Sequence, residues 1–354
     1  MSQFWSQIVN KLTPYVPGEQ PKVKDLIKLN TNENPYPPSE KVRQVLSAVA
    51  QDSLQLYPDP NADDLKQNIA DYYQLNKAQV FVGNGSDEVL AHTFVALLKH
   101  EQPILFPDLS YSFYPVYCGL FSVDYQTIPV NDDFEIDIED YKLKNGGIIF
   151  PNPNAPTSCF LNLEAIEKLL SFNMDSVVVV DEAYIDFGGD SAAKLIDKYD
   201  NLLVIQTFSK SRSLAGLRVG FALGQTHLIE ALERVKNSFN SYPLDFFAQK
   251  GAIAAINDKQ YFQESIDKII ASRGYLTEKL TELEFKVLPS KANFIFVSHQ
   301  SINAEKLARE LRQKNIIVRH FKQDRIENFL RITIGKQNEC EQLLSAIKSI
   351  ISQS

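Results

Sequence analysis

The run SVVVVDEAY, residues 176–184, decides the fold class. Four consecutive valines end at Asp181, and a short continuous β-branched run is typical of a strand buried on both faces of a sheet. Helical patterns lie between such runs, as in LEAIEKLLSF (163–172), where apolar residues recur every three or four positions. Similar strand patterns are QVFVG (79–83), QPILFP (102–107), GGIIFP (146–151), NLLVIQTFS (201–209) and VGFALG (219–224). The alternation predicts a doubly wound α/β unit with a mostly parallel sheet.

The pattern changes after Pro243, where a long and mostly helical stretch begins. Three short strand patterns follow it, namely ANFIFVS (292–298), NIIVRHF (315–321) and FLRITIG (329–335), with helical patterns between and after them. These elements predict a smaller α+β unit. We therefore expect an arm that includes part of the small domain (1–40), a large α/β domain (41–245), a linking helical stretch (246–283) and a small C-terminal domain (284–354).

Composition narrows the class of function. The chain has 354 residues, a formal net charge of −8 and 44% apolar residues, which fits an ordinary globular protein and argues against nucleic acid or an anionic membrane as partner. The N-terminus lacks a secretory pattern and no stretch is long enough to span a membrane. The cysteines Cys118, Cys159 and Cys340 form no CxxC pair, and the five histidines offer no zinc spacing. We expect a cytoplasmic protein without a metal site.

Polar residues gather where the predicted strands end. Ligands bind outside the carboxyl ends of the strands in an open parallel sheet, and here PNPNAPT, Asp181 and Lys210 each follow a strand pattern. Asp181 is also consistent with a turn cap, and Lys210 alone with a surface lysine. Burial makes a carboxylate expensive unless a cation pairs with it. The combination with Tyr184, three residues after Asp181, and Arg218, eight after Lys210, favours a site.

The loop VGNGSDEVL (82–90) provides a candidate phosphate cup. Two glycines and a serine lie between a strand and a helix, so free N–H groups and the helix dipole are available for an anion; a purely structural turn is the alternative. The loop lacks the third glycine of a dinucleotide fingerprint, and no Walker pattern occurs in the chain. An amine, a buried acid, a phosphate cup and a phenol together fit pyridoxal phosphate.

Seven motifs carry a resemblance to the fold-type I aminotransferases that covers nearly the whole chain, and within them to the histidinol-phosphate aminotransferase branch. They are LTPYVPG (12–18), KLNTNENPYPP (28–38), LYPDP (56–60), VGNGSDE (82–88), VVVVDEAYIDF (177–187), TFSKSRSLAGLRVGF (207–221) and LRITIG (330–335). The resemblance implies a large domain that binds pyridoxal 5'-phosphate, a smaller α+β domain and a homodimer as the active unit.

The resemblance also implies roles for individual residues. Lys210 corresponds to the Schiff-base lysine that shuttles the substrate proton, Asp181 to the partner of the pyridine nitrogen and Tyr184 to the donor toward the phenolic oxygen. The remaining cofactor positions are Gly85, Ser86, Asp87, Thr207, Ser209 and Arg218 around the phosphate, Tyr111 stacked on the ring, and Tyr57 reaching the partner subunit's phosphate.

The segment PNPNAPTS departs from the family pattern. Ala155 stands where the family usually has an asparagine that bonds to the phenolic oxygen, and Ser158 stands at the usual glycine. An amide from Asn154 or Asn152 could substitute, and we assign Asn154 to the cofactor.

For the substrate, the resemblance points to Arg331 and Arg319 as the anion grip, with Tyr15 and Asn32 beside it; a surface role at a strand edge is the alternative for Arg319. The implied reaction converts L-histidinol phosphate and 2-oxoglutarate into imidazole acetol phosphate and L-glutamate in histidine biosynthesis. A threonine-phosphate decarboxylase, an aromatic amino acid aminotransferase and a regulator that binds pyridoxal phosphate without chemistry are the alternatives. A dinucleotide oxidoreductase is disfavoured by the missing fingerprint.

Overall fold

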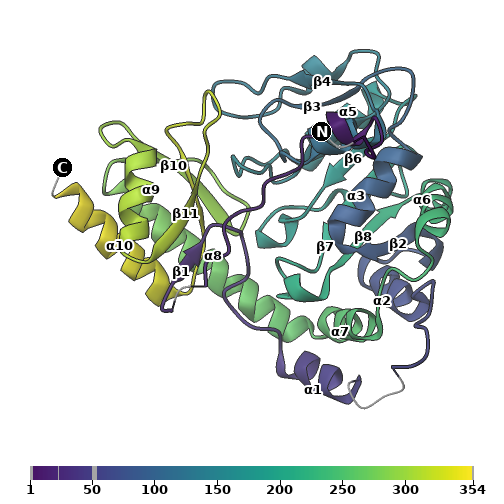
Figure 1. Cartoon of the computed structure of the whole chain (residues 1–354), viewed down its shortest axis with the longest axis horizontal. Helices are drawn as coiled ribbons and strands as arrows, with labels where there is room; N and C mark the ends of the chain where they lie inside the picture. The colour runs from purple at the N-terminus through teal and green to yellow at the C-terminus, as the bar shows by residue number, and fades with distance from the viewer. Residues whose placement is uncertain (1–2, 23, 50–53, 353–354) are drawn as a thin grey trace.

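Two sheets organise the chain in the computed structural model, which describes residues 3–22, 24–49 and 54–352 (Figure 1). The larger sheet has seven strands in the order β2-β8-β7-β6-β5-β3-β4. Its strands are β2 (Val80–Asn84), β3 (Ile104–Pro107), β4 (Tyr125–Ile128), β5 (Ile148–Pro151), β6 (Val178–Asp181), β7 (Leu202–Thr207) and β8 (Val219–Gly224). Only β8 pairs antiparallel with its neighbours β2 and β7, so the sheet is mostly parallel, as the sequence predicts.

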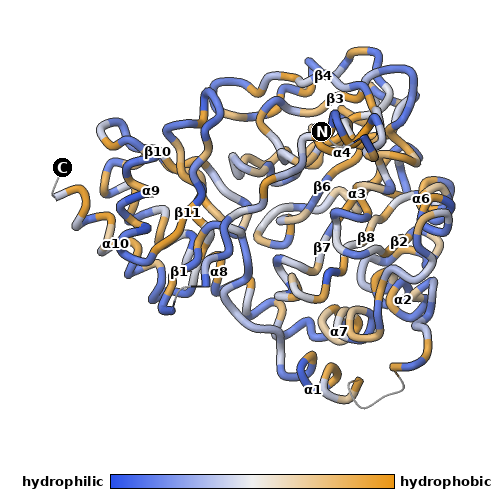
Figure 2. Tube along the Cα trace, in the orientation of Figure 1, coloured by the Kyte–Doolittle hydropathy of each residue, from blue (hydrophilic) through white to orange (hydrophobic). Residues whose placement is uncertain are grey.

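Helices cover both faces of the large sheet. Along β6, Val178 and Val180 belong to one buried cluster, whereas Val179 belongs to the other. The first cluster includes residues of α2 (Asp63–Tyr73), α5 (Leu163–Phe172) and α7 (Phe246–Asn257), and the second includes residues of α3 (Gly85–Ala96), α4 (Tyr114–Phe121) and α6 (Thr226–Phe239). Hydrophobic and hydrophilic segments alternate along α6, as expected of a helix with one buried face (Figure 2). The predicted doubly wound α/β fold is confirmed.

The smaller sheet has five strands in the order β1-β11-β12-β10-β9. They are β1 (Ile27–Leu29), β9 (Phe285–Val287), β10 (Phe294–His299), β11 (Ile316–His320) and β12 (Leu330–Thr333). Strand β1 pairs parallel with β11, so the start of the chain joins the small domain before the large domain begins. Helices α8 (Lys259–Thr281), α9 (Ala304–Gln313) and α10 (Gln337–Ile351) pack on this sheet around one core, and the long α8 leads from the large domain into it (Figure 1).

The remaining helices are α1 (Glu40–Val49) and the short 3₁₀ helices η1 (Val9–Lys11), η2 (Lys77–Gln79), η3 (Ile138–Tyr141), η4 (Ile185–Phe187), η5 (Ala192–Leu195) and η6 (Ala215–Leu217). Strands β1, β4 and β9 are absent from the sequence-based expectations. Strand β4 is an edge strand with three exposed residues, so it leaves no apolar run in the sequence. Among the described residues, no helix is long and apolar enough to cross a membrane.

Candidate active site

A cavity of about 530 Å³ lies where the carboxyl ends of β5, β6 and β7 face the small domain. Most of the residues predicted for the site line this cavity: Tyr15, Asn32, Ser86, Asp87, Tyr111, Asp181, Tyr184, Thr207, Ser209, Lys210, Arg218, Arg319 and Arg331. They come from the N-terminal arm, from loops after four strands of the large sheet, and from β11 and β12. The structure therefore brings together segments that are about 300 residues apart in the sequence.

Asp181 is the last residue of β6 and is buried at the floor of the cavity. Its carboxylate accepts hydrogen bonds from the Tyr114 hydroxyl at 3.0 Å and from the Ala183 N–H at 3.3 Å. Burial raises the pKa of Asp181 to about 6, although both hydrogen bonds lower it. A buried carboxylate of this kind is suited to a cationic partner placed in the cavity.

Lys210 follows β7 and supplies an amine to the same cavity. Its Nζ donates to the backbone oxygen of Thr31 at 3.2 Å and lies 5.8 Å from the centre of the Tyr184 ring. The Asn34 amide holds the loop from the other side, since it donates to the backbone oxygens of Lys210 and Ser211. Lys210 is the one lysine among the described residues that line the cavity, and no histidine or cysteine accompanies it there.

The Tyr184 hydroxyl has one lone pair already in use. It accepts a hydrogen bond from Asn32 Nδ2 at 3.0 Å, so its own proton remains available for a ligand. Asn32 has a positive φ of 56°, and Thr333 fixes its pose through the Asn32 N–H and Oδ1, each at 3.0 Å. Asn32 thus orients the phenol, in addition to lining the cavity.

The candidate phosphate cup lies at the N-terminus of α3. Gly85 and Ser86 begin this twelve-residue helix, and Arg218 approaches it with Nη1 at 3.4 Å from Ser209 Oγ. Arg218 Nη2 donates to Asp87 at 2.8 Å, and the Tyr111 hydroxyl donates to the same carboxylate at 3.2 Å. Asp87 therefore positions the predicted phosphate-binding arginine and the predicted stacking tyrosine. A cup of helix N–H groups and a guanidinium suits an anion.

Two arginines form the small-domain wall of the cavity. Arg319 on β11 and Arg331 on β12 are register partners, so both extend from adjacent strands. Arg331 donates to the Asn30 backbone oxygen at 3.0 Å, whereas its buried Nε has no hydrogen-bond partner among the described residues. Burial lowers the pKa of Arg331, and neighbouring Arg319 lowers it further. Leaving a buried donor unpaired costs free energy, and an anionic ligand would remove that cost.

Three predicted residues do not line the cavity. Gly85 is buried at the start of α3, next to Arg218. Asn154, assigned to the cofactor from the sequence, has a buried Nδ2 that donates to the Leu109 backbone oxygen and to Thr157 Oγ1, and Ala155 lines the cavity in its place. The side chains of these two adjacent residues point in opposite directions, so only that of Ala155 faces the cavity. Tyr57 is 80% exposed and stacks on Tyr242, outside the cavity of its own chain.

Comparison with known proteins gives the family. The profile of the family "Aminotransferase class I and II" matches residues 24–347. The chain belongs to this family of aminotransferases. It is similar to histidinol-phosphate aminotransferase 1 of Hydrogenovibrio crunogenus (63% identity over 351 residues, 99% of each chain) and to histidinol-phosphate aminotransferase 2 of Dechloromonas aromatica (62% over 354 residues, 99% of each chain). The crystal structure of histidinol-phosphate aminotransferase from Sinorhizobium meliloti in complex with pyridoxal-5'-phosphate shares the fold, with a TM-score of 0.88 at 23% identity over 100% of this chain and 99% of that one.

The cavity of this aminotransferase fits pyridoxal phosphate. The fit rests on a buried acid with a raised pKa, a single lysine and a glycine at the anion cup: a Cβ on Gly85 would lie 2.3 Å from Arg218 Nη2. Asp181 would hold the ring nitrogen, Lys210 the aldehyde carbon, and Arg218 with the start of α3 the phosphate. No group of acidic, histidine or cysteine residues suited to a metal occurs in the described ranges.

We expect Gly85→Ala to weaken cofactor binding about tenfold. Gly85 has a φ of 76°, which costs an alanine about 1 kcal/mol or more, and the new methyl group would displace the Arg218 guanidinium. Titration of the apoenzyme with pyridoxal phosphate, followed by visible absorption, measures the affinity. Gly119→Ala on α4 is the matched control, because nothing lies within 4 Å of its new methyl group. Equal affinities of the two variants would contradict the proposed cup.

Proposed function

We propose that this aminotransferase uses pyridoxal 5'-phosphate to transfer the amino group of L-histidinol phosphate to 2-oxoglutarate, giving imidazole acetol phosphate and L-glutamate in histidine biosynthesis. The observation that carries the proposal is a pair of arginines: Arg319 and Arg331 lie side by side on adjacent strands and line the same cavity as Lys210. A guanidinium that lines the cavity and has a buried, unpaired Nε suits the phosphate of the donor and, in the second half-reaction, the carboxylate of the keto acid. The names of relatives more than 60% identical over nearly the whole chain support this substrate.

The residues of the site have separate roles in the proposed reaction. The bound cofactor supplies an aldehyde and an electron-withdrawing ring. Lys210 Nζ is the group available to take a proton from the donor's α-carbon and return it, because the described cavity lining contains no other amine or imidazole. Tyr184, oriented by Asn32, donates its hydroxyl proton to the ligand. Tyr15 closes the cavity from the arm, where its ring lies 4.8 Å from that of Phe113 and 6.5 Å from that of Tyr111.

We also propose that the active unit is a cytoplasmic homodimer in which Tyr57 reaches the partner subunit's phosphate cup. The exposed pair of Tyr57 and Tyr242 supports this arrangement, because its stacked rings form an apolar surface outside the chain's own cavity. The exposed side chains of Leu54 and Leu56 precede Tyr57 and extend that surface.

The visible spectrum of the purified enzyme tests the reaction. We expect L-histidinol phosphate, added without keto acid, to remove the absorption band of the bound cofactor, and 2-oxoglutarate to restore it. L-phenylalanine and L-threonine phosphate, added in the same way, are the comparison donors. A larger response to phenylalanine would indicate an aromatic amino acid aminotransferase. Release of carbon dioxide from threonine phosphate without amino transfer would indicate a decarboxylase, and no response to any donor would favour a non-catalytic binding protein.

A further inference from the structure

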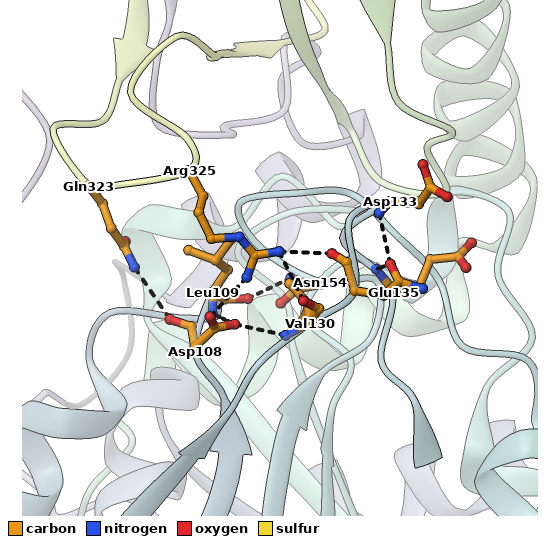
Figure 3. A network of polar contacts seen from close by, with 9 residues as sticks. Asp108, Leu109, Val130, Asp133, Glu135, Asn154, Gln323 and Arg325 are labelled. Carbon is orange, nitrogen blue, oxygen red and sulfur yellow. Dashed lines mark hydrogen bonds and ion pairs between the residues drawn. The ribbon is translucent and has the colours of Figure 1, made fainter. Parts of the chain in front are cut away.

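A polar network joins the two domains beside the active site (Figure 3). On the small-domain side, the segment after β11 lines the cavity with Phe321 and Gln323, continuing the wall that Arg319 begins. On the large-domain side, the loop after β3 lines it with Ser110, Tyr111 and Ser112. The network lies where these two walls meet, and the catalytic roles proposed above do not use it.

Arg325 is the centre of this network. Its Nη1 donates to Asp108 Oδ2 at 3.1 Å, and its Nη2 donates to the backbone oxygens of Val130 and Asn131, each at 2.9 Å. The guanidinium also lies 5.8 Å from the centre of the Phe134 ring. One small-domain side chain therefore contacts two separate segments of the large domain, at the ends of β3 and β4.

Asp108 is held rigidly for this contact. Its Oδ1 accepts hydrogen bonds from the backbone N–H groups of Leu109 and Val130 at 2.9 and 3.0 Å, which leaves Oδ2 for Arg325. Its own N–H donates to the Ile128 backbone oxygen at 2.9 Å, and its backbone oxygen accepts from Gln323 Nε2 at 3.4 Å. The carboxylate thus connects the loop that carries Tyr111 to the segment that carries Gln323.

The backbone of Arg325 is in a conformation that non-glycine residues rarely adopt. Its φ is 68°, in the left-handed region, which an L-residue occupies only when its surroundings compensate for the conformational cost. The guanidinium of the same residue makes three hydrogen bonds across the domain boundary. The unusual backbone conformation of Arg325 and its three hydrogen bonds indicate a specific contact between the two domains.

An apolar cluster lies beneath the polar network and also spans both domains. Leu109, Val130 and Phe134 come from the large domain, and Leu288, Phe296 and Ile326 come from the small domain. The rings of Phe296 and Phe329 stack at 4.7 Å. Because Ile326 directly follows Arg325, the polar contact and the apolar cluster hold the same segment against the large domain.

We propose that Arg325 is a positioning residue for substrate binding: through Asp108 it fixes the wall formed by Arg319, Phe321 and Gln323 relative to the loop that carries Tyr111. The width of the substrate end of the cavity is thereby set before the substrate enters. Removing this connection loosens the anion grip and the distal wall, whereas Lys210, Asp181 and the phosphate cup belong to the large domain and keep their positions. The substrate named in the test rests on the proposed function, but the role of Arg325 does not.

The test compares Arg325→Ala, Arg325→Lys and Asp108→Asn with Arg309→Ala, an exposed arginine on α9 of the same domain. Asp108→Asn keeps one oxygen to accept the two backbone N–H groups and removes the charge that faces Arg325. For the holoenzyme acting on L-histidinol phosphate, we expect Arg325→Ala and Asp108→Asn to raise KM about tenfold with kcat within about threefold of the wild type. We expect Arg325→Lys to recover part of the loss, and Arg309→Ala to leave both constants unchanged.

A double variant tests whether Arg325 and Asp108 affect substrate binding through their mutual contact. The double variant Arg325→Ala/Asp108→Asn is expected to raise KM no further than Arg325→Ala alone, because the Asp108 carboxylate acts through the guanidinium that Arg325→Ala already removes. Cofactor affinity, followed by visible absorption, should match the wild type in every variant. An unchanged KM in folded Arg325→Ala, or a fall in kcat alone, would overturn the proposal. If Arg325→Ala does not fold, Arg325→Lys and Asp108→Asn decide it by the same criterion. A wild-type enzyme that rejects histidinol phosphate would overturn the proposed function, and the comparison would then use whichever donor the wild type accepts.

Discussion

Replacing Lys210 by alanine is expected to lower transamination more than about ten-thousandfold while leaving the protein folded. Proton transfer by one positioned base accounts for about a hundred- to ten-thousandfold in rate, and loss of the covalent lysine adds to this. The described residues that line the cavity contain no second amine or imidazole to replace Lys210. The substitution removes one side-chain hydrogen bond, to the Thr31 backbone oxygen, so the effect on the free energy of unfolding is expected to be about 1 kcal/mol or less.

Three measurements separate this outcome from unfolding or loss of the cofactor site. Circular dichroism and thermal unfolding check the fold, and the rate is measured with saturating L-histidinol phosphate and 2-oxoglutarate. Dialysis then distinguishes the covalent site, because the variant should release pyridoxal phosphate that the wild type retains. Lys322→Ala is the matched control, since this lysine is 83% exposed and lies in the segment next to the cavity wall. Appreciable transamination by Lys210→Ala would contradict the assignment.

The sequence predicts the centre of the fold and the floor of the site because both depend on local patterns. Four valines followed by Asp181 indicate a central strand with a carboxylate at its carboxyl end, and the structure has both. The Lys210 loop follows β7 for the same reason. Parallel strands end at a common edge, so their terminal residues meet without further information.

Contacts that depend on the three-dimensional path of irregular segments could not be predicted. Asn34 holds the Lys210 loop, but nothing periodic in its Pro-rich segment indicates where that segment passes. Neither of the two candidate amides, Asn154 and Asn152, lines the cavity, and a non-repetitive loop gives no alternation rule that would show which side chain faces inward. Arg325 contacts Asp108 from 217 residues away, and an isolated arginine in a polar loop resembles any exposed cation in the sequence.

The acidic residue after Asp181 shows another limit of the sequence. Glu182 is buried and accepts hydrogen bonds from Ser191 Oγ, the Ala192 N–H and Gln206 Nε2. Burial raises the pKa of Glu182 to about 8 despite these bonds. The DEAY motif thus contains two buried carboxyl groups, of which Asp181 lines the cavity and Glu182 fixes the neighbouring loop. Sequence alone does not distinguish their directions, because both follow the end of the same strand.

Asp181→Asn is expected to lower kcat at least about a hundredfold while making the apoenzyme more stable than the wild type at neutral and alkaline pH. An asparagine provides no negative charge for a cation in the cavity, and loss of one preorganised electrostatic contact costs about a hundred- to a thousandfold in rate. In the wild type the Tyr114 hydroxyl bonds to Oδ2 and the Ala183 N–H to Oδ1, so the amide oxygen of the asparagine keeps one of these acceptor positions and its NH2 group can donate to the Tyr114 oxygen at the other.

The pH dependence of apoenzyme stability follows from the raised pKa of Asp181, about 6 in the folded chain against an ordinary value of 3.8. Because the folded state binds this proton more tightly, Asp181 favours folding below its ordinary pKa, and that contribution is lost as the pH rises through about 6. The asparagine of the variant does not titrate, so the free energy of unfolding of the variant relative to the wild type should increase by about 1 kcal/mol between pH 5 and pH 8. Urea unfolding of both apoenzymes at the two pH values measures the increase. Added pyridoxal phosphate should reverse the order at pH 8, because only the wild type gains a charge pair in the cavity. A variant that retains wild-type kcat, or a stability difference independent of pH, would show that Asp181 is not the buried charged partner of the cofactor.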